Sequence, residues 1–223
     1  MNKRHEPNKY SAAILAGGES RRMGYDKALL TAPGGKSNLR LLADSLSAHY
    51  GDVFIVRRRG VFEGSALPAG VRVVFDDMDE PGPMTGFVSA LANAEGEYVF
   101  VCACDARPVL CAYMDLIDGR ICRQKDMQNN GRVYAQKSIS GGERDYAQVK
   151  PDSYDAVLPR TGGLIQPFWS LYNKRLLPQA RVAVLAKRQS IFRFIEKRFI
   201  YIIEESEIVE AGIPASMFAN QNE

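Results

Sequence analysis

Histidine, cysteine and tryptophan are scarce in this chain, with two, four and one of each among 223 residues. Four cysteines without a Cys-x-x-Cys pair argue against a disulfide framework and against a zinc or iron–sulfur cluster. No apolar run approaches the roughly 18 residues of a membrane span, and residues 199–203 have only strand length. The polar residues 1–9 contain no secretory signal. We therefore expect a reduced, cytoplasmic protein that does not contact a membrane.

An excess charge of one sign is also missing, since 29 lysines and arginines face 26 acidic residues for a net charge of +3. This balance is too small to indicate nucleic-acid binding. With 46% hydrophobic residues, the composition is that of a globular protein, and the length favours one domain over residues 1–223. We expect residues 1–9 to be a flexible tail. We interpret about 119–152, polar and with seven basic against four acidic residues, as an inserted excursion.

Short apolar runs alternate with amphipathic stretches along the rest of the chain. This alternation indicates βαβ units, hence an α/β fold with a mostly parallel sheet covered on both faces. The expected strands are residues 10–16, 52–56, 71–75, 98–104, 154–158, 165–172 and 199–203. The expected helices are residues 39–48, 84–94, 174–187 and 190–197, the last capped by Ser190.

Residues 15–30 read Leu-Ala-Gly-Gly-Glu-Ser-Arg-Arg-Met-Gly-Tyr-Asp-Lys-Ala-Leu-Leu and carry the chemistry. The pair Gly17–Gly18 directly follows a buried strand, where glycine lets backbone N–H groups turn tightly against an anion. Arg21, Arg22 and Lys27 add positive charge to the same segment. The segment therefore suits a polyphosphate, although a glycine pair alone more often marks a simple turn beside a solvated charged face.

The complete pattern of residues 15–30 resembles the signature of the molybdenum cofactor guanylyltransferases. These belong to a wider nucleotidyltransferase family that includes sugar-phosphate cytidylyltransferases. Later segments resemble further motifs of the family in the same order, at residues 75–77, 82–86, 104–108, 163–172 and 218–222. The resemblance implies a three-layer α/β/α, Rossmann-like nucleotidyltransferase fold with a mostly parallel mixed sheet.

The resemblance also implies residue roles. The implied nucleotide-binding residues are Leu15, Ala16, Gly17, Gly18, Lys27, Asp76 and Asp105. The implied catalytic residues are Lys27, Arg22 and Asp105, with Mg²⁺ held by Asp105. General chemistry agrees, because ligands of open α/β sheets bind beyond the carboxyl ends of the strands and Mg²⁺ uses one or two carboxylates together with phosphates. Asp105 is also consistent with an ordinary strand-end aspartate, and Asp77 could replace Asp76.

The activity implied by the resemblance is transfer of GMP from GTP to molybdopterin cofactor, forming its guanine dinucleotide and releasing pyrophosphate. The implied partners are GTP, molybdopterin cofactor, and a receiving molybdoenzyme or another cofactor-biosynthesis protein. One alternative is a cytidylyltransferase acting on molybdopterin or another phosphate acceptor. A second is a non-catalytic module that binds nucleotide or delivers cofactor.

Several residues depart from the family pattern or have no clear role in it. Residues 56–59, Val-Arg-Arg-Arg, stand where family members often carry an asparagine. The chain ends at Glu223 before the family's Thr-Pro, which leaves the contribution of Asn220 and Asn222 open. Of the aromatic residues on the presumed acceptor side, Phe168, Trp169 and Tyr172, we expect at least two to pack in the core. We expect both His5 and His49 to be solvated surface residues.

Overall fold

The computed structural model describes residues 9–17, 35, 37–58, 67–76, 78, 80–130 and 153–218, except for the side chains of residues 122–130. The predicted tail, apart from Lys9, and residues 131–152 of the predicted insertion lie outside this part. So do Gly18, Arg22, Lys27, Asn220 and Asn222.

Eight strands of the described residues form one mixed sheet, in the order β3-β2-β1-β4-β7-β5-β6, with β8 also paired to β5. Neighbouring strands β3, β2, β1 and β4 are parallel, β7 is antiparallel to both β4 and β5, and β8 is parallel to β5. The bounds are β1 Tyr10–Leu15, β2 Asp52–Arg57, β3 Arg72–Phe75, β4 Tyr98–Ala103, β5 Ala156–Thr161, β6 Leu164–Ile165, β7 Ser170–Asn173 and β8 Ile200–Ile203. This confirms the predicted mixed sheet with a parallel core.

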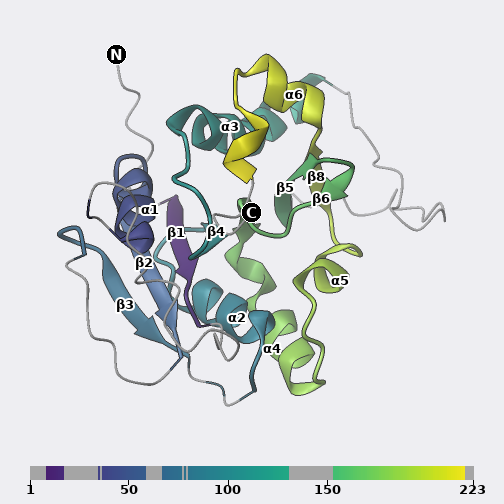
Figure 1. Cartoon of the computed structure of the whole chain (residues 1–223). Helices are drawn as coiled ribbons and strands as arrows, with labels where there is room; N and C mark the ends of the chain where they lie inside the picture. Colours follow the sequence, from purple (N-terminus) through teal and green to yellow (C-terminus); the bar gives the residue numbers. More distant parts are fainter. Residues whose placement is uncertain are drawn as a thin grey trace.

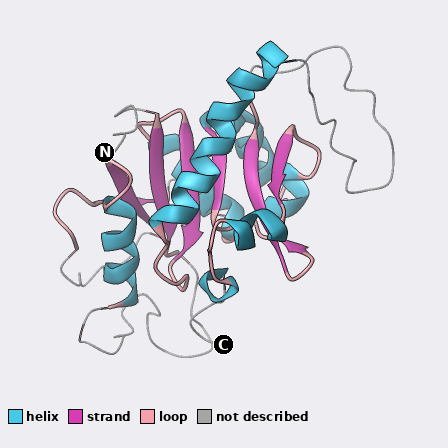
Figure 2. Ribbon diagram, turned by 90° about the horizontal axis from the view of Figure 1, so that it is seen from above, coloured by secondary structure: helices cyan, strands magenta, loops and turns pink. Residues whose placement is uncertain are grey.

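Helices cover both faces of the sheet (Figures 1 and 2). Side chains of α1 (Asn38–Ser47), α3 (Cys111–Asn130) and α6 (Glu205–Glu210) pack into one buried cluster. Side chains of α2 (Pro83–Asn93), α4 (Leu177–Leu185) and α5 (Ile191–Ile195) pack into the other. Strands β1, β2 and β4 contribute alternate residues to the two clusters, which explains why their sequences are continuously apolar.

Local sequence accounts for where several helices begin. The Ser37 hydroxyl accepts a bond from the Arg40 N–H at 3.2 Å and caps α1, while Ser190 caps α5 as predicted, through the Arg193 N–H at 3.2 Å. Pro83 occupies the first turn of α2, where a missing N–H costs nothing. None of the described helices is long and apolar enough to cross a membrane.

Three sequence predictions need correction. The predicted start of the excursion, at about residue 119, lies inside α3, and Ile121 in that helix is buried in the core. The single strand predicted for residues 165–172 is interrupted, because β6 ends at Ile165 and β7 begins at Ser170. The predicted helix at residues 174–187 begins as the 3₁₀ turn η2 (Lys174–Leu176) and ends at Leu185.

Candidate functional site

The carboxyl ends of four parallel strands meet at one edge of the sheet. Backbone pairing continues there beyond the strands, with the Ala16 N–H bonded to the Val56 carbonyl at 2.8 Å and the Cys104 N–H to the Leu15 carbonyl at 3.1 Å. On the far side of β2, the Asp76 N–H bonds to the Arg57 carbonyl at 2.8 Å. The residues that follow β1, β2, β3 and β4 are thereby brought to the same edge, where open α/β sheets bind their ligands.

Gly17 and Asp76 lie close together at this edge, although 59 positions separate them in the sequence. A methyl group built on Gly17 would lie 3.5 Å from Asp76 Oδ2 and 3.5 Å from the Arg58 amide nitrogen. These are ordinary van der Waals separations, so the described protein atoms do not themselves require glycine at position 17. The structure thus unites two residues of the predicted nucleotide site.

Asp105 lies at the same edge, in a turn directly after β4. The Ala106 N–H bonds to the Ala103 carbonyl at 3.0 Å and closes this turn around Cys104 and Asp105. Asp105 is half-buried and makes no hydrogen bond or ion pair within the described part of the chain. A carboxylate in that state fits the ligand chemistry of Mg²⁺, which combines one or two carboxylates with substrate phosphates. Among the described residues, no three His, Cys, Asp or Glu side chains come together as a metal site of their own.

Basic residues border the same edge. Arg57 is half-buried at the end of β2, and Arg58 and Arg107 are exposed. The predicted phosphate-binding residues Arg22, Lys27 and Gly18 lie outside the described residues, so their positions relative to Asp76 and Asp105 stay predictions.

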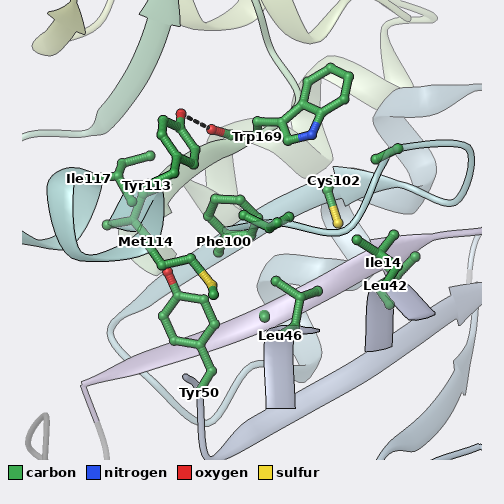
Figure 3. Close-up of a cluster of buried hydrophobic side chains, with 14 of the residues drawn as sticks. Ile14, Leu42, Leu46, Tyr50, Phe100, Cys102, Tyr113, Met114, Ile117 and Trp169 are labelled. Carbon is green, nitrogen blue, oxygen red and sulfur yellow. Dashed lines mark hydrogen bonds between the residues drawn. The ribbon is translucent and has the colours of Figure 1, made fainter. Parts of the chain in front are cut away.

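The aromatic residues of the predicted acceptor side belong mainly to the core. Trp169 is 3% exposed and Tyr172 is fully buried, whereas Phe168 is half-buried. The Trp169 carbonyl accepts a 2.5 Å hydrogen bond from the Tyr113 hydroxyl (Figure 3), and its indole ring packs against Phe218. This confirms that at least two of the three pack in the core. Trp169 also has a left-handed backbone angle, φ 57°, directly before β7 begins.

His49 is not a solvated surface residue, so that prediction was wrong. Its side chain is 7% exposed, and Nε2 lies 3.0 Å from Oδ2 of the buried Asp118 in α3. The Tyr50 hydroxyl donates to Asp118 Oδ1 at 3.1 Å, and burial followed by the Asp118 charge raises the pKa of Tyr50 well above its ordinary value. His49 and Tyr50 precede β2, at the edge of the sheet opposite Asp105, so this network is separate from the candidate site.

The fold, a mixed sheet with a parallel core, is like that of nucleotidyltransferases of known structure. Residues 12–114 match the MobA-like NTP transferase domain family. The matched residues contain the glycine segment, Asp76 and Asp105.

Comparisons over nearly the whole chain agree. The chain is 28% identical over 209 residues to a probable molybdenum cofactor guanylyltransferase of Pelotomaculum thermopropionicum, covering 93% of this chain and 85% of that protein. It is 27% identical over 217 residues to a molybdenum cofactor guanylyltransferase of Syntrophotalea carbinolica, covering 95% and 86%. Its fold resembles the crystal structure of molybdopterin-guanine dinucleotide biosynthesis protein A from Archaeoglobus fulgidus, with TM-score 0.60 and 16% identity over 90% of this chain and 86% of that one.

Proposed function

We propose that the protein transfers GMP from GTP to molybdopterin cofactor, forming the guanine dinucleotide and releasing pyrophosphate. The observation that carries this proposal is the family match of residues 12–114, together with relatives that bear this name and align with over nine-tenths of the chain. The meeting of Gly17, Asp76 and Asp105 at one sheet edge supports a nucleotide site there.

The chemistry asks for positioning and charge neutralisation. A phosphate oxygen of the acceptor attacks the α-phosphorus of GTP, the bond from that phosphorus to the β-phosphate oxygen breaks, and pyrophosphate leaves. The acceptor phosphate has a second pKa of about 6 and is already largely dianionic at pH 7, so no histidine base is required. Neither His49 nor the rest of its network is needed in this scheme.

We assign roles to the chain's residues accordingly. The backbone of residues 15–18 would bind the guanine nucleotide, and Asp76 beside Gly17 would contact the nucleoside. Lys27 and Arg22 would neutralise phosphate charge during transfer. Asp105 would hold Mg²⁺, which supplies further neutralisation of the triphosphate when bound.

The direct test is product formation with molybdopterin cofactor, Mg²⁺ and each of GTP, CTP, ATP and UTP, followed by pyrophosphate release and the mass of the product. We expect turnover with GTP. Turnover with CTP alone would refute guanylyl transfer and establish the cytidylyltransferase alternative. Asp105→Asn should lower the rate by at least about 100-fold, since the metal contributes several kcal/mol to such reactions. Glu95→Gln, at the opposite end of β4, is the matched control and should keep full activity.

The non-catalytic alternative predicts a different result. If wild type, Lys27→Ala and Asp105→Ala release pyrophosphate at the same background rate, the chain has no transferase activity and only a binding or delivery role is left. Nucleotide binding by each variant, measured by calorimetry, then shows whether the glycine segment holds GTP at all.

Gly17→Ala tests the nucleotide position separately from the chemistry. Since a methyl group at Gly17 meets the described protein atoms at ordinary distances, the free energy of unfolding should change by less than about 1 kcal/mol. A nucleotide approaching that backbone closely would be displaced, and we expect KM for GTP to rise at least about tenfold. Gly51→Ala, where an added methyl meets nothing within 4 Å, is the control. An unchanged KM in Gly17→Ala would remove this glycine from the site.

A further inference from the structure

We infer that Asn38, the first residue of α1, is a positioning residue for the Asp105 turn. Its side-chain amide Nδ2 donates to the carbonyl of Cys104 at 3.3 Å and to the carbonyl of Ala106 at 3.5 Å. These two carbonyls flank Asp105 on either side. The Asn38 side chain, from α1, therefore binds the backbone on both sides of Asp105, the residue that the proposed function assigns to the metal.

The orientation of the Asn38 amide follows from its partners. A carbonyl oxygen can only accept a hydrogen bond, and each N–H of the amide can serve one of the two carbonyls. The exchanged orientation would place Oδ1 against both carbonyl oxygens, which is repulsive. Both distances are long for N–H···O bonds.

Burial shows that this amide is not a solvated helix-end residue. Asn38 is 3% exposed and lies on the buried face of α1 with the apolar residues Leu39, Leu42, Ala43 and Leu46. Burying an amide at such a position is unfavourable unless hydrogen bonds replace water. Oδ1 of Asn38 is buried without a hydrogen-bond partner in the described part of the chain, which adds to that cost. The two hydrogen bonds that Nδ2 donates to the Asp105 turn offset this desolvation cost.

Two backbone hydrogen bonds also hold the turn. One bond closes it, from the Ala106 N–H to the Ala103 carbonyl, and one ties Cys104 back to β1 through the Leu15 carbonyl. The carbonyls of Cys104 and Ala106 are oriented by α1 through Asn38. Fixing the backbone on both sides of Asp105 restricts where its carboxylate lies, and groups that orient a metal ligand in this way typically change metal affinity or activity by about 10–100-fold when removed.

This inference rests on the proposed role of Asp105, and its test separates the two. Asn38→Leu replaces the amide by an apolar side chain of similar size, and Asn38→Ala is a second variant suited to a helix in case the leucine cannot pack. Ser45→Ala is the matched control. The Ser45 hydroxyl also links α1 to the chain after β4, accepting from the Val109 N–H at 3.1 Å, but it does not contact the residues flanking Asp105.

The readout is binding of Mn²⁺ in the presence of a non-hydrolysable GTP analogue, followed by electron paramagnetic resonance of free Mn²⁺, with calorimetric affinity for the analogue and thermal unfolding measured alongside. We expect Asn38→Leu and Asn38→Ala to weaken Mn²⁺ binding by about tenfold or more while affinity for the analogue without metal changes less than about twofold. In turnover, the same variants should raise the Mg²⁺ concentration for half-maximal rate more than they raise KM for GTP. Ser45→Ala should lower thermal stability without changing metal affinity.

These measurements distinguish failure of the Asn38 role from failure of the metal assignment to Asp105. If Asp105→Asn loses metal binding and both Asn38 variants keep it, the positioning role is wrong and the proposed function stands. If Asp105→Asn binds Mn²⁺ as well as wild type, the metal assignment itself fails, and the role of Asn38 fails with it. If metal-free analogue affinity and metal affinity fall together in the Asn38 variants, Asn38 supports the fold around the nucleotide rather than the Asp105 turn, which also overturns the inference.

Discussion

Replacing Asp118 by alanine should destabilise the protein more than any change to its exposed charges. Asp118 is 1% exposed on its side chain, and its two carboxylate oxygens lie 3.0 Å from His49 Nε2 and 3.1 Å from the Tyr50 hydroxyl. Removing the carboxylate leaves both partners buried with unmet hydrogen bonds. Losing one partner of such a buried arrangement costs about 3–5 kcal/mol. For a chain of this length that corresponds to a fall in Tm of roughly 6–20 °C.

The comparison is Asp115→Ala, one turn earlier in α3. The Asp115 side chain is 66% exposed and its carboxylate is 4.0 Å from His49 Nδ1, so water screens the interaction and we expect a change of about 0–1 kcal/mol. Urea unfolding followed by circular dichroism measures both. Equal losses in the two variants would show that burial of Asp118 does not set its contribution, and the reasoning would be refuted.

Three further predictions concern glycine packing, alkaline pH and tryptophan fluorescence. Gly96→Ala should prevent stable folding, because its Cβ would lie 2.8 Å from backbone atoms of Lys9 and Tyr10. In Gly86→Ala the Cβ would lie 3.6 Å from the flexible end of Leu15, and this variant should fold normally. Similar Tm values for the two variants would contradict this. Burial and Asp118 raise the pKa of Tyr50. Its neutral form therefore contributes stability below about pH 10, and this contribution is lost as the pH rises further. Tyr50→Phe should make the decline of Tm above about pH 10 less steep, and an identical slope would refute the assignment. The single tryptophan, Trp169, is 3% exposed, so acrylamide should quench its fluorescence only weakly in the native protein. Loss of the ring contact in Phe218→Ala should increase the quenching. Strong quenching in the native protein would contradict the burial of Trp169.

The sheet and its binding edge were accessible from sequence for a physical reason. Strands buried on both faces must be apolar throughout, so residues 10–16, 52–56 and 98–104 stand out as short continuous runs. The family resemblance implied that Gly17, Asp76 and Asp105 share one site, and for Asp105 the rule that ligands bind beyond the carboxyl ends of parallel strands agreed with it. In the structure Gly17 lies beside Asp76 and Asp105 follows β4 at the same end of the sheet, although the sequence alone could not choose between Asp76 and Asp77.

Features that depend on tertiary contacts were missed. Helix α3 was not predicted, because the polar residues from about 119 onward were interpreted as an insertion. The buried Tyr113, Met114, Ile117 and Ile121 lie at helical spacing, and their burial shows the place of α3 in the core. His49 looked solvated because its partner Asp118 is 69 positions away. Asn38 passed unnoticed for the same reason, since only a long-range contact distinguishes it from an ordinary polar residue at a helix start.

The Asp118 network and the Asn38 contacts with the Asp105 turn lie at opposite ends of β1. Effects of substitutions on stability and on nucleotide binding should therefore be separable. Tyr10, the first residue of β1, donates its hydroxyl to the Asp118 carbonyl at 3.5 Å, whereas Leu15, the last, accepts from the Cys104 N–H beside the Asp105 turn. Below its lowered Tm, Asp118→Ala should therefore keep the wild-type KM for GTP and the wild-type Mg²⁺ dependence. Asn38→Ala should show the opposite pattern. Compared with Asp118→Ala, it should lower Tm less and raise the Mg²⁺ concentration for half-maximal rate more. If Asp118→Ala at low temperature shifted the Mg²⁺ dependence as much as Asn38→Ala, the two ends of the sheet would be coupled and this separation would be wrong.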